Sequence, residues 1–474
     1  MKQTTLKKES LGLWSIVFFV IAAASPLTGA VGALPIAFMA GNGPGIPGIY
    51  VVAGILLTLF SFGFIAMSRH VVNSGAFYSY VSKGLGPSSG LAAFFVAILA
   101  YLSMVFSVSS LFGFFASIFL ASNFGIDVPW WMLAIANQLI VVLLGIAKVE
   151  IGGRILGVLM LLEVAIILLV DLVIIKQPIA MEFTSFTPSV TFSGNAGVGL
   201  IFAICSFIGF EASAIYSEEC KTPEKTIPRA TLVAVAIITI FYAFTAWAIV
   251  QYVGDTKVGE VAAQDPGMFI YNIADQLLGP WSSQVMSVLL ITSLFAATQA
   301  FHNTLSRYLF SLSRDGLCWS KFSTLHPKYH TPYVASLIQG VAIVVGLLIL
   351  VSMGLDPMAN IFAWASALGA ISILALQCAV SFAVVAFFMR NPSLQASLWS
   401  RLISPALAAI GMVLSLYMVI NNLDVLSGSN SPVVRALPYL VVAFAVLGFV
   451  IAKRLHQANP ARFASMTKVV NTLK

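Results

Sequence analysis

The sequence predicts an all-α membrane protein with twelve transmembrane helices. Of its 474 residues, 59% are hydrophobic and only 9% are charged, and the mean hydropathy is +0.99. This composition provides too little polar surface to cover a globule in water. Stretches of about 20 apolar residues, enough to cross a hydrocarbon core, follow one another from Leu11 almost to the C-terminus. Helices satisfy their own backbone polar groups in lipid, and the short alternating strands of a barrel are not seen.

The predicted spans cover residues 11–40, 47–67, 88–121, 129–147, 154–176, 196–217, 229–253, 282–312, 332–353, 358–389, 402–422 and 435–455. The first span is too long for the apolar core of a signal peptide and has no small-residue cleavage site, so we expect it to be retained. The spans divide the chain into an N-terminal segment (1–10), two five-helix units (11–176 and 196–389), helices eleven and twelve (402–455) and a tail (456–474).

The positive charges predict the topology. The net charge is +7, and with the N-terminus inside only Lys176, Lys257 and Arg435 fall outside. This bias predicts a bacterial-type inner (plasma) membrane protein with both termini on the cytoplasmic side. No basic domain lies behind these charges, which argues against a nucleic-acid partner. The four cysteines have no disulfide or metal spacing, so neither a metal nor an organic cofactor is expected.

Two spans contain sequences that interrupt a helix. The first includes Pro26, Gly29 and Gly32, and the sixth includes Gly209 beside Glu211. Proline removes a backbone donor and glycine weakens a helix. Either segment alone is as well read as an ordinary kink. Their matching positions in helices one and six favour an inverted-repeat transporter, whose substrate binds where such helices are broken.

Three acids fall at membrane depth. Glu163 lies nine residues beyond Arg154, about 13 Å from the inner edge at 1.5 Å per residue. Asp171 lies two turns further on and on the same face, and Glu211 lies beside the second break. A charge at the bilayer centre is costly and persists mainly for a purpose. The alternatives are a structural acid for Glu163, an interfacial acid for Asp171 and a brace of the broken helix for Glu211.

Three segments carry a resemblance to a known family. The first is Phe207 to Ala230, which contains Gly209-Phe210-Glu211, the acid pair Glu218-Glu219 and the ending Ile227-Pro228-Arg229-Ala230. The second is Asn73 to Tyr80, and the third is Asn303 to Pro332, which contains Ser313-Arg314-Asp315-Gly316. Their order and spacing resemble those of the amino acid/polyamine/organocation (APC) permease family. The resemblance implies a LeuT-like fold of two inverted five-helix repeats plus two C-terminal helices. It also implies a substrate pocket between helices one and six, lined by helices three, eight and ten.

The function that the resemblance implies is secondary active transport by alternating access, not enzymatic activity. An amino acid is the favoured substrate, and a polyamine or other organic amine is the alternative. A channel is disfavoured because no repeated filter-like sequence is present. The expected partners are the small amine or amino acid substrate and the lipid bilayer, and the choice between monomer and homodimer stays open.

The candidate substrate site combines the two breaks with polar and aromatic residues at similar depth. The first break departs from the glycine-rich signature of many relatives, although Thr28, Gly29 and Ala30 can still present amides to an anion. Cys205 stands where arginine/agmatine-type relatives carry a gating aromatic. Aromatic faces suit an ammonium group, with core packing as the alternative. The predicted substrate-binding residues are Ser25, Thr28, Gly29, Ala30, Tyr101, Cys205, Phe207, Gly209, Glu211, Gln299 and Trp364.

Glu163 and Asp171 are the candidate ion-coupling residues. Counted from Gly152-Gly153-Arg154, Glu163 falls where the family commonly has a lysine, at the place where sodium-coupled relatives bind their ion. An acid at this place can carry a proton or help to bind sodium. We favour the proton, because a carboxyl group shielded from water can take up a proton and release it again.

Overall fold

The computed structural model describes residues 11–71, 75–147, 149–177, 181–394, 396–460 and 463. The predicted N-terminal segment 1–10, most of the tail 456–474, and Asn73 and Ser74 of one motif lie outside these residues. Within the described part the regular elements are helices, and the one β-type contact is an isolated bridge between Leu11 and Cys220. The all-α fold class predicted from the sequence is confirmed.

Eleven helices of the described part are long and apolar enough to cross a membrane. They cover Leu13–Ala40, Gly43–Ser68, Pro87–Phe124, Gly157–Ile175, Ala196–Glu219, Pro223–Val253, Trp281–Arg314, Tyr333–Ser352, Pro357–Arg390, Trp399–Asn421 and Pro432–Ala458. The remaining predicted span, 129–147, corresponds to α7 (Trp130–Ile146), which is apolar but has only 17 residues. The count of twelve membrane helices and the inverted repeat therefore stay predictions.

The outer surface of the helices is apolar. Ile240, Val341 and Val446 are each 53% exposed or more, although they lie near the middle of long helices. Large exposed apolar faces are unfavourable in water and are expected where a helix contacts lipid. The chain is therefore a multi-pass membrane protein.

The helices near the two predicted breaks are short. The first span consists of α1 (Leu13–Ala24), α2 (Pro26–Thr28), a π-helical turn (Gly29–Ala33) and α3 (Leu34–Ala40). Ser25 separates α1 from α2 in a left-handed conformation, with φ 47°. The sixth span consists of α10 (Ala196–Cys205) and the 3₁₀ helix η4 (Phe210–Glu219), separated around Gly209 with φ 109°. Both predicted interruptions are present in the backbone.

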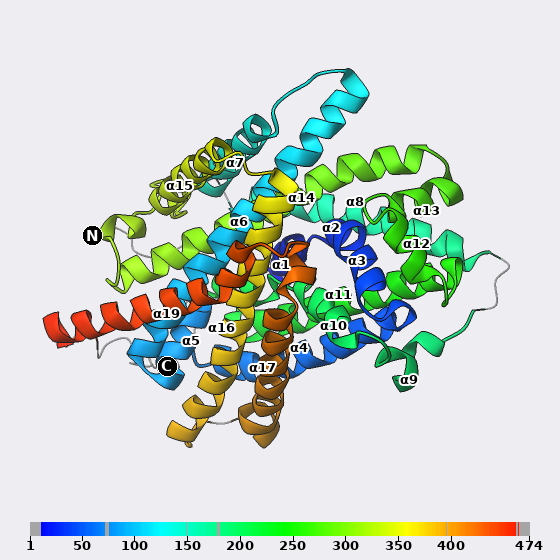
Figure 1. Ribbon diagram of the computed structural model, residues 1–474. Helices are drawn as coiled ribbons and strands as arrows, with labels where there is room; N and C mark the ends of the chain where they lie inside the picture. The colour runs from blue at the N-terminus through cyan, green and yellow to red at the C-terminus, as the bar shows by residue number, and fades with distance from the viewer. Residues whose placement is uncertain are drawn as a thin grey trace.

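Long helices surround these broken ones. The longest, α6 (Pro87–Phe124), packs against α14 (Trp281–Arg314), α16 (Ala363–Arg390) and α19 (Pro432–Ala458), as Figure 1 shows. α1 packs against α14 and also against α8 and α11, and α11 in turn packs along α4. The bounds of these last three are Val149–Ile175 for α8, Pro223–Val253 for α11 and Ile46–Ser68 for α4.

Smaller helices complete the structure. The connection 254–280 contains α12 (Val258–Gln264), which packs on α3, and α13 (Phe269–Leu278), which packs on α14. Phe269, Ile273 and Leu277 recur at helical spacing along α13. Further elements are α5 (Ala76–Leu85), α15 (Tyr333–Ser352), the π-helical turn η6 (Pro357–Phe362), α17 (Ser404–Asn421) and α18 (Leu423–Ser427).

Candidate functional site

The break in the first span is held by side chains from three other helices. Tyr242 of α11 donates its hydroxyl hydrogen to the Pro26 carbonyl at 3.3 Å. The backbone N–H of Leu27 donates to the carboxylate of Glu163, on α8. Thr28 donates to Ser293 of α14 at 3.3 Å, and Ser293 donates to Glu163 Oε2 at 2.6 Å. Glu163 therefore joins the start of α2 to the surrounding helices through both backbone and side-chain contacts.

Glycine at position 29 is required by close packing. A Cβ atom built there would lie 1.9 Å from the hydroxyl oxygen of Tyr242. The ring of Tyr242 stacks on that of Tyr50, with centroids 5.0 Å apart, and the Tyr50 hydroxyl lies 3.2 Å from Ser206 Oγ. This pair of tyrosines connects the break in the first span to the start of the break in the sixth.

The two breaks also meet directly. A Cβ atom at Gly209 would lie 2.5 Å from Cβ of Ala23, which is two residues before the left-handed Ser25. Its positive φ and the close approach of Ala23 both require glycine at this position. The matched interruptions predicted from the sequence thus lie in contact with each other in the fold.

Glu211 is fully buried beside this contact. Its Oε1 accepts a hydrogen bond from the Tyr101 hydroxyl of α6 at 3.2 Å, and its Oε2 accepts one from the Gly209 N–H at 3.1 Å. Its own backbone N–H also donates to the carboxylate. The ring of Tyr101 lies 5.5 Å from that of Tyr308 and 6.5 Å from that of Phe301, between centroids. Two of the predicted site residues, Tyr101 and Glu211, are therefore brought together.

Asp171 lies further along α8 and is also fully buried. Thr245 of α11 donates to its Oδ2 at 2.7 Å, and Oδ1 has no hydrogen-bond partner within the described residues. In this part of the chain no lysine or arginine forms an ion pair with Glu163, Asp171 or Glu211. An acid buried without a counter-ion is costly when it is charged. Each of these acids is therefore suited to take up a proton or to meet a cationic ligand.

The other predicted site residues lie in or near the breaks with less defined roles. Ser25 donates to the carbonyl of Ala22 at 3.2 Å, Ala30 and Phe207 are buried, and Cys205 ends α10 partly buried. Gln299 donates to Asn303 of its own helix at 3.1 Å, and Trp364 Nε1 is buried without a partner in the described part. No hydrogen bond recorded for these residues joins Gln299 or Trp364 to a break.

Several contacts were not anticipated from the sequence. Tyr50, Tyr242, Thr245 and Ser293 supply most of the hydrogen bonds at the breaks and at Asp171. The available signal was weak, because single hydroxyl residues are common in membrane helices and often bond to their own backbone. Their side chains become partners only because α8, α11 and α14 converge on the first span and α4 packs along α11.

The end of η4 and the C-terminal part of α14 are joined by ion pairs. Arg307 of α14 binds Glu219, at the end of η4, through Nε at 2.5 Å and Nη2 at 3.2 Å, and both side chains are nearly completely buried. The guanidinium of Arg307 also lies 4.7 Å from the ring centroid of Tyr216. The N–H of Leu11 donates to the Glu219 carbonyl at 3.1 Å. Arg314 binds Glu218 in a second, more exposed pair.

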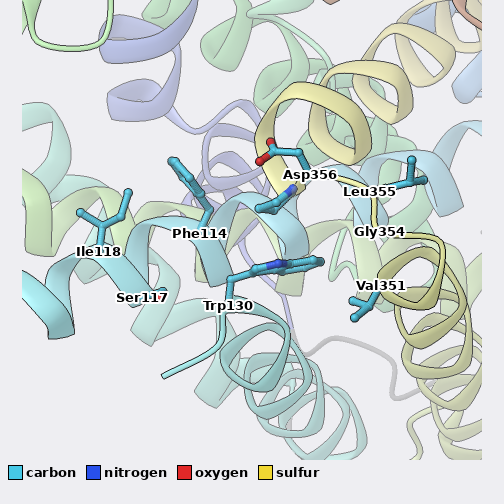
Figure 2. A pocket seen from close by; sticks show the side chains of 9 residues that line it. Phe114, Ser117, Ile118, Trp130, Val351, Gly354, Leu355 and Asp356 are labelled. Carbon is cyan, nitrogen blue, oxygen red and sulfur yellow. The ribbon is translucent and has the colours of Figure 1, made fainter. Parts of the chain in front are cut away.

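A separate cavity of about 500 Å³ lies beside the C-terminal part of α6. Figure 2 shows Trp130, at the start of α7, together with Phe114 of α6 and Asp356, which precedes η6. The Asp356 carboxylate accepts hydrogen bonds from the N–H groups of Met358 and Ala359 and so begins η6. None of the predicted site residues lines this cavity.

Comparison with known proteins agrees with this architecture. The model of a family described as amino acid permease matches residues 11–451. The methylthioribose transporter of Bacillus subtilis is 26% identical over 375 residues, 75% of this chain and 76% of the relative. The branched-chain amino acid permease BcaP of the same organism is 25% identical over 401 residues, 80% and 81% of the two chains. The low-affinity putrescine importer PlaP of Escherichia coli is 24% identical over 311 residues, 62% and 65%.

These named relatives are permeases and importers rather than enzymes, and the matched region contains both broken helices and all three buried acids. The chain belongs to the amino acid permease family, within the amino acid/polyamine/organocation superfamily.

Proposed function

We propose that this protein is a secondary active transporter that moves a small amine-bearing solute, an amino acid or an organic amine, by alternating access. The observation that carries the proposal is the direct contact of the two breaks, at Ala23 and Gly209, with the buried Glu211 beside them. Broken helices that meet at mid-membrane are where inverted-repeat transporters bind their solutes. Relatives named for branched-chain amino acids and for putrescine support both solute classes.

We assign the coupling role to Glu163, with a proton as the coupling ion. Its carboxylate accepts hydrogen bonds from the Leu27 N–H and from Ser293, so its charge sets how firmly α2 is held against α8 and α14. Protonation makes the carboxyl group a weaker hydrogen-bond acceptor and so links proton uptake to movement of the broken helix. A proton is favoured over sodium because sodium is bound by oxygen atoms, whereas here an N–H group points at the carboxylate. Asp171 is the second candidate of this kind.

The ion pairs at the cytoplasmic ends support alternating access over a channel. Arg307 and Glu219, together with the backbone contact of Leu11, close the ends of α1, η4 and α14 on one another. A solute released on this side must first separate this buried pair. A carrier makes such a separation once per cycle. For the orientation we propose the bacterial inner membrane, with both termini in the cytoplasm.

The test is uptake into proteoliposomes with and without a pH gradient, measured for a panel of labelled amino acids and amines. We expect gradient-driven accumulation of at least one solute by the unaltered protein. Glu163→Gln keeps an acceptor for Leu27 but cannot titrate, so it should retain solute exchange and lose accumulation. Asp424→Asn, at an exposed acid in α18, is the matched control. Accumulation by Glu163→Gln with unaltered pH dependence would show that the coupling assignment is wrong, and ion currents far above carrier rates would favour a channel.

A further inference from the structure

The backbone amides at the break of the sixth span are already bonded within the chain. A substrate carboxylate is held at a broken helix by N–H groups that have no other partner. Here the amides of residues 206, 207, 208, 210 and 212 donate to backbone carbonyls. The two amides between them, those of Gly209 and Glu211, donate to the Glu211 carboxylate. An acid of the protein itself therefore occupies the place that a substrate anion would take.

The break of the first span is occupied in the same way. The amides of Ser25 and Gly29 donate to backbone carbonyls, and Pro26 has no N–H. The amide of Leu27 donates to Glu163. At most one amide of this stretch, that of Thr28, is left for an anion. Both half-helix starts are thus capped by carboxylates of the protein, and the negative charge expected there is supplied internally.

The charges at the site also disfavour a solute with a free carboxylate. Glu211 and Glu163 are buried beside the two breaks, and the described cations with ion pairs, Arg307 and Arg314, bind Glu219 and Glu218 at the helix ends instead. No described cation compensates the two acids. A solute with a free carboxylate would meet like charge without an arginine or lysine to bind it. A solute with only an ammonium group would supply the missing positive charge.

The groups around Glu211 also suit an ammonium group. A carboxylate has about four lone-pair positions, and the Glu211 carboxylate accepts hydrogen bonds from three donors. Tyr101, which donates one of them, lies beside Tyr308 and Phe301 and brings aromatic rings close to the acid. Aromatic faces attract ammonium ions most strongly where water is excluded.

We propose that the transported solute is an organic amine that carries no free carboxylate, with its ammonium group bound at Glu211. This proposal rests on the proposed transport function and decides between the two solute classes that the function leaves open. It predicts a preference for the decarboxylated member of any pair of otherwise identical solutes.

The experiment uses matched pairs that differ only in the carboxylate: leucine and isoamylamine, ornithine and putrescine, lysine and cadaverine. Affinity is measured on the purified full chain by calorimetry, and transport by counterflow in proteoliposomes. We expect the amine of at least one pair to bind at least about tenfold more tightly than its amino acid and to support counterflow. Equal or tighter binding of the amino acid in the pairs that bind would overturn the proposal, and so would binding of no amine at all.

The transport function and the solute class can be refuted separately. Counterflow of an amino acid without its amine would leave the transporter intact and refute the solute class. Absence of counterflow for every solute would count against both. Glu211→Gln should reduce amine affinity at least about tenfold and bring the ratio between amine and amino acid close to one. Asp424→Asn should leave the ratio unchanged, and an unchanged ratio in Glu211→Gln would refute the assignment to Glu211.

Discussion

Removing the positive charge of Arg307 should open the side of the protein on which η4 and α14 end. The side chains of Arg307 and Glu219 are 2% and 3% exposed, and Arg307→Met would remove the guanidinium that binds the buried Glu219 carboxylate. Breaking one side of a buried pair costs about 3–5 kcal/mol. Where the state open on this side lets water reach Glu219, the cost falls on the closed state alone. At about 1.4 kcal/mol per factor of ten, 3 kcal/mol moves the balance roughly a hundredfold towards the open state.

Cys220 is a built-in reporter of this opening. It follows Glu219 directly, is 5% exposed and donates to the Tyr216 carbonyl. Burial raises the pKa of the Cys220 thiol to about 12, so the closed protein holds little of the reactive thiolate. Opening exposes the thiol, and its rate of modification by N-ethylmaleimide should rise with the open population. Peptide mass spectrometry separates Cys220 from the other three cysteines, which are all free thiols.

The second ion pair provides a matched control. Arg314 and Glu218 are 24% and 16% exposed, so Arg314→Met should cost no more than about 1 kcal/mol and change the rate at Cys220 by about fivefold or less. Adding Glu219→Gln to Arg307→Met removes the carboxylate charge that Arg307 binds. The modification rate of Cys220 should then return most of the way to that of the unaltered protein. Equal labelling of the Arg307→Met and Arg314→Met proteins would refute the reasoning.

Two further predictions concern packing and pH. Gly29→Ala would place Cβ 1.9 Å from the Tyr242 hydroxyl and should destabilise the protein by about 1–3 kcal/mol, seen as a lower Tm, whereas Gly32→Ala, with no atom within 4 Å, should leave Tm almost unchanged. Equal Tm values for the two variants would contradict this contact. Burial raises the pKa of Asp315 above its ordinary 3.8, so stability should fall as the pH rises from that value through the higher pKa of the folded protein. Asp315→Asn should raise Tm at pH 7 and flatten Tm between pH 4 and 7, and a lower Tm at pH 7 would contradict the sign.

The long elements of the fold were predictable from the sequence. Apolar runs of about 20 residues must become helices in lipid, since no water is present to bond an open backbone. The interruptions at Pro26 and Gly209 were equally visible, because proline lacks an N–H and glycine tolerates a positive φ. α7 shows the limit of this reasoning: its 17 residues are apolar, but length alone does not assign it as a full span.

The partners of the buried acids could not be predicted in the same way. Ser293 is 130 residues from Glu163, and Tyr101 is 110 residues from Glu211. No local pattern announces such pairs, because a tyrosine or serine in a membrane helix has many equivalent uses. The resemblance to known permeases indicated a candidate site at the two breaks, and it left open how the amides there are used.

The sequence by itself determined a bundle of membrane helices, two broken helices and three acids at membrane depth, because these follow from local backbone chemistry and from the cost of charge in lipid. The tertiary structure alone decided what the broken helices bind. Packing brings Glu163 onto the Leu27 amide, and the turn at Gly209 returns Glu211 onto its own backbone. Both acids cap positions that would otherwise attract an anion, since a buried N–H must find an acceptor and each carboxylate is the acceptor within reach.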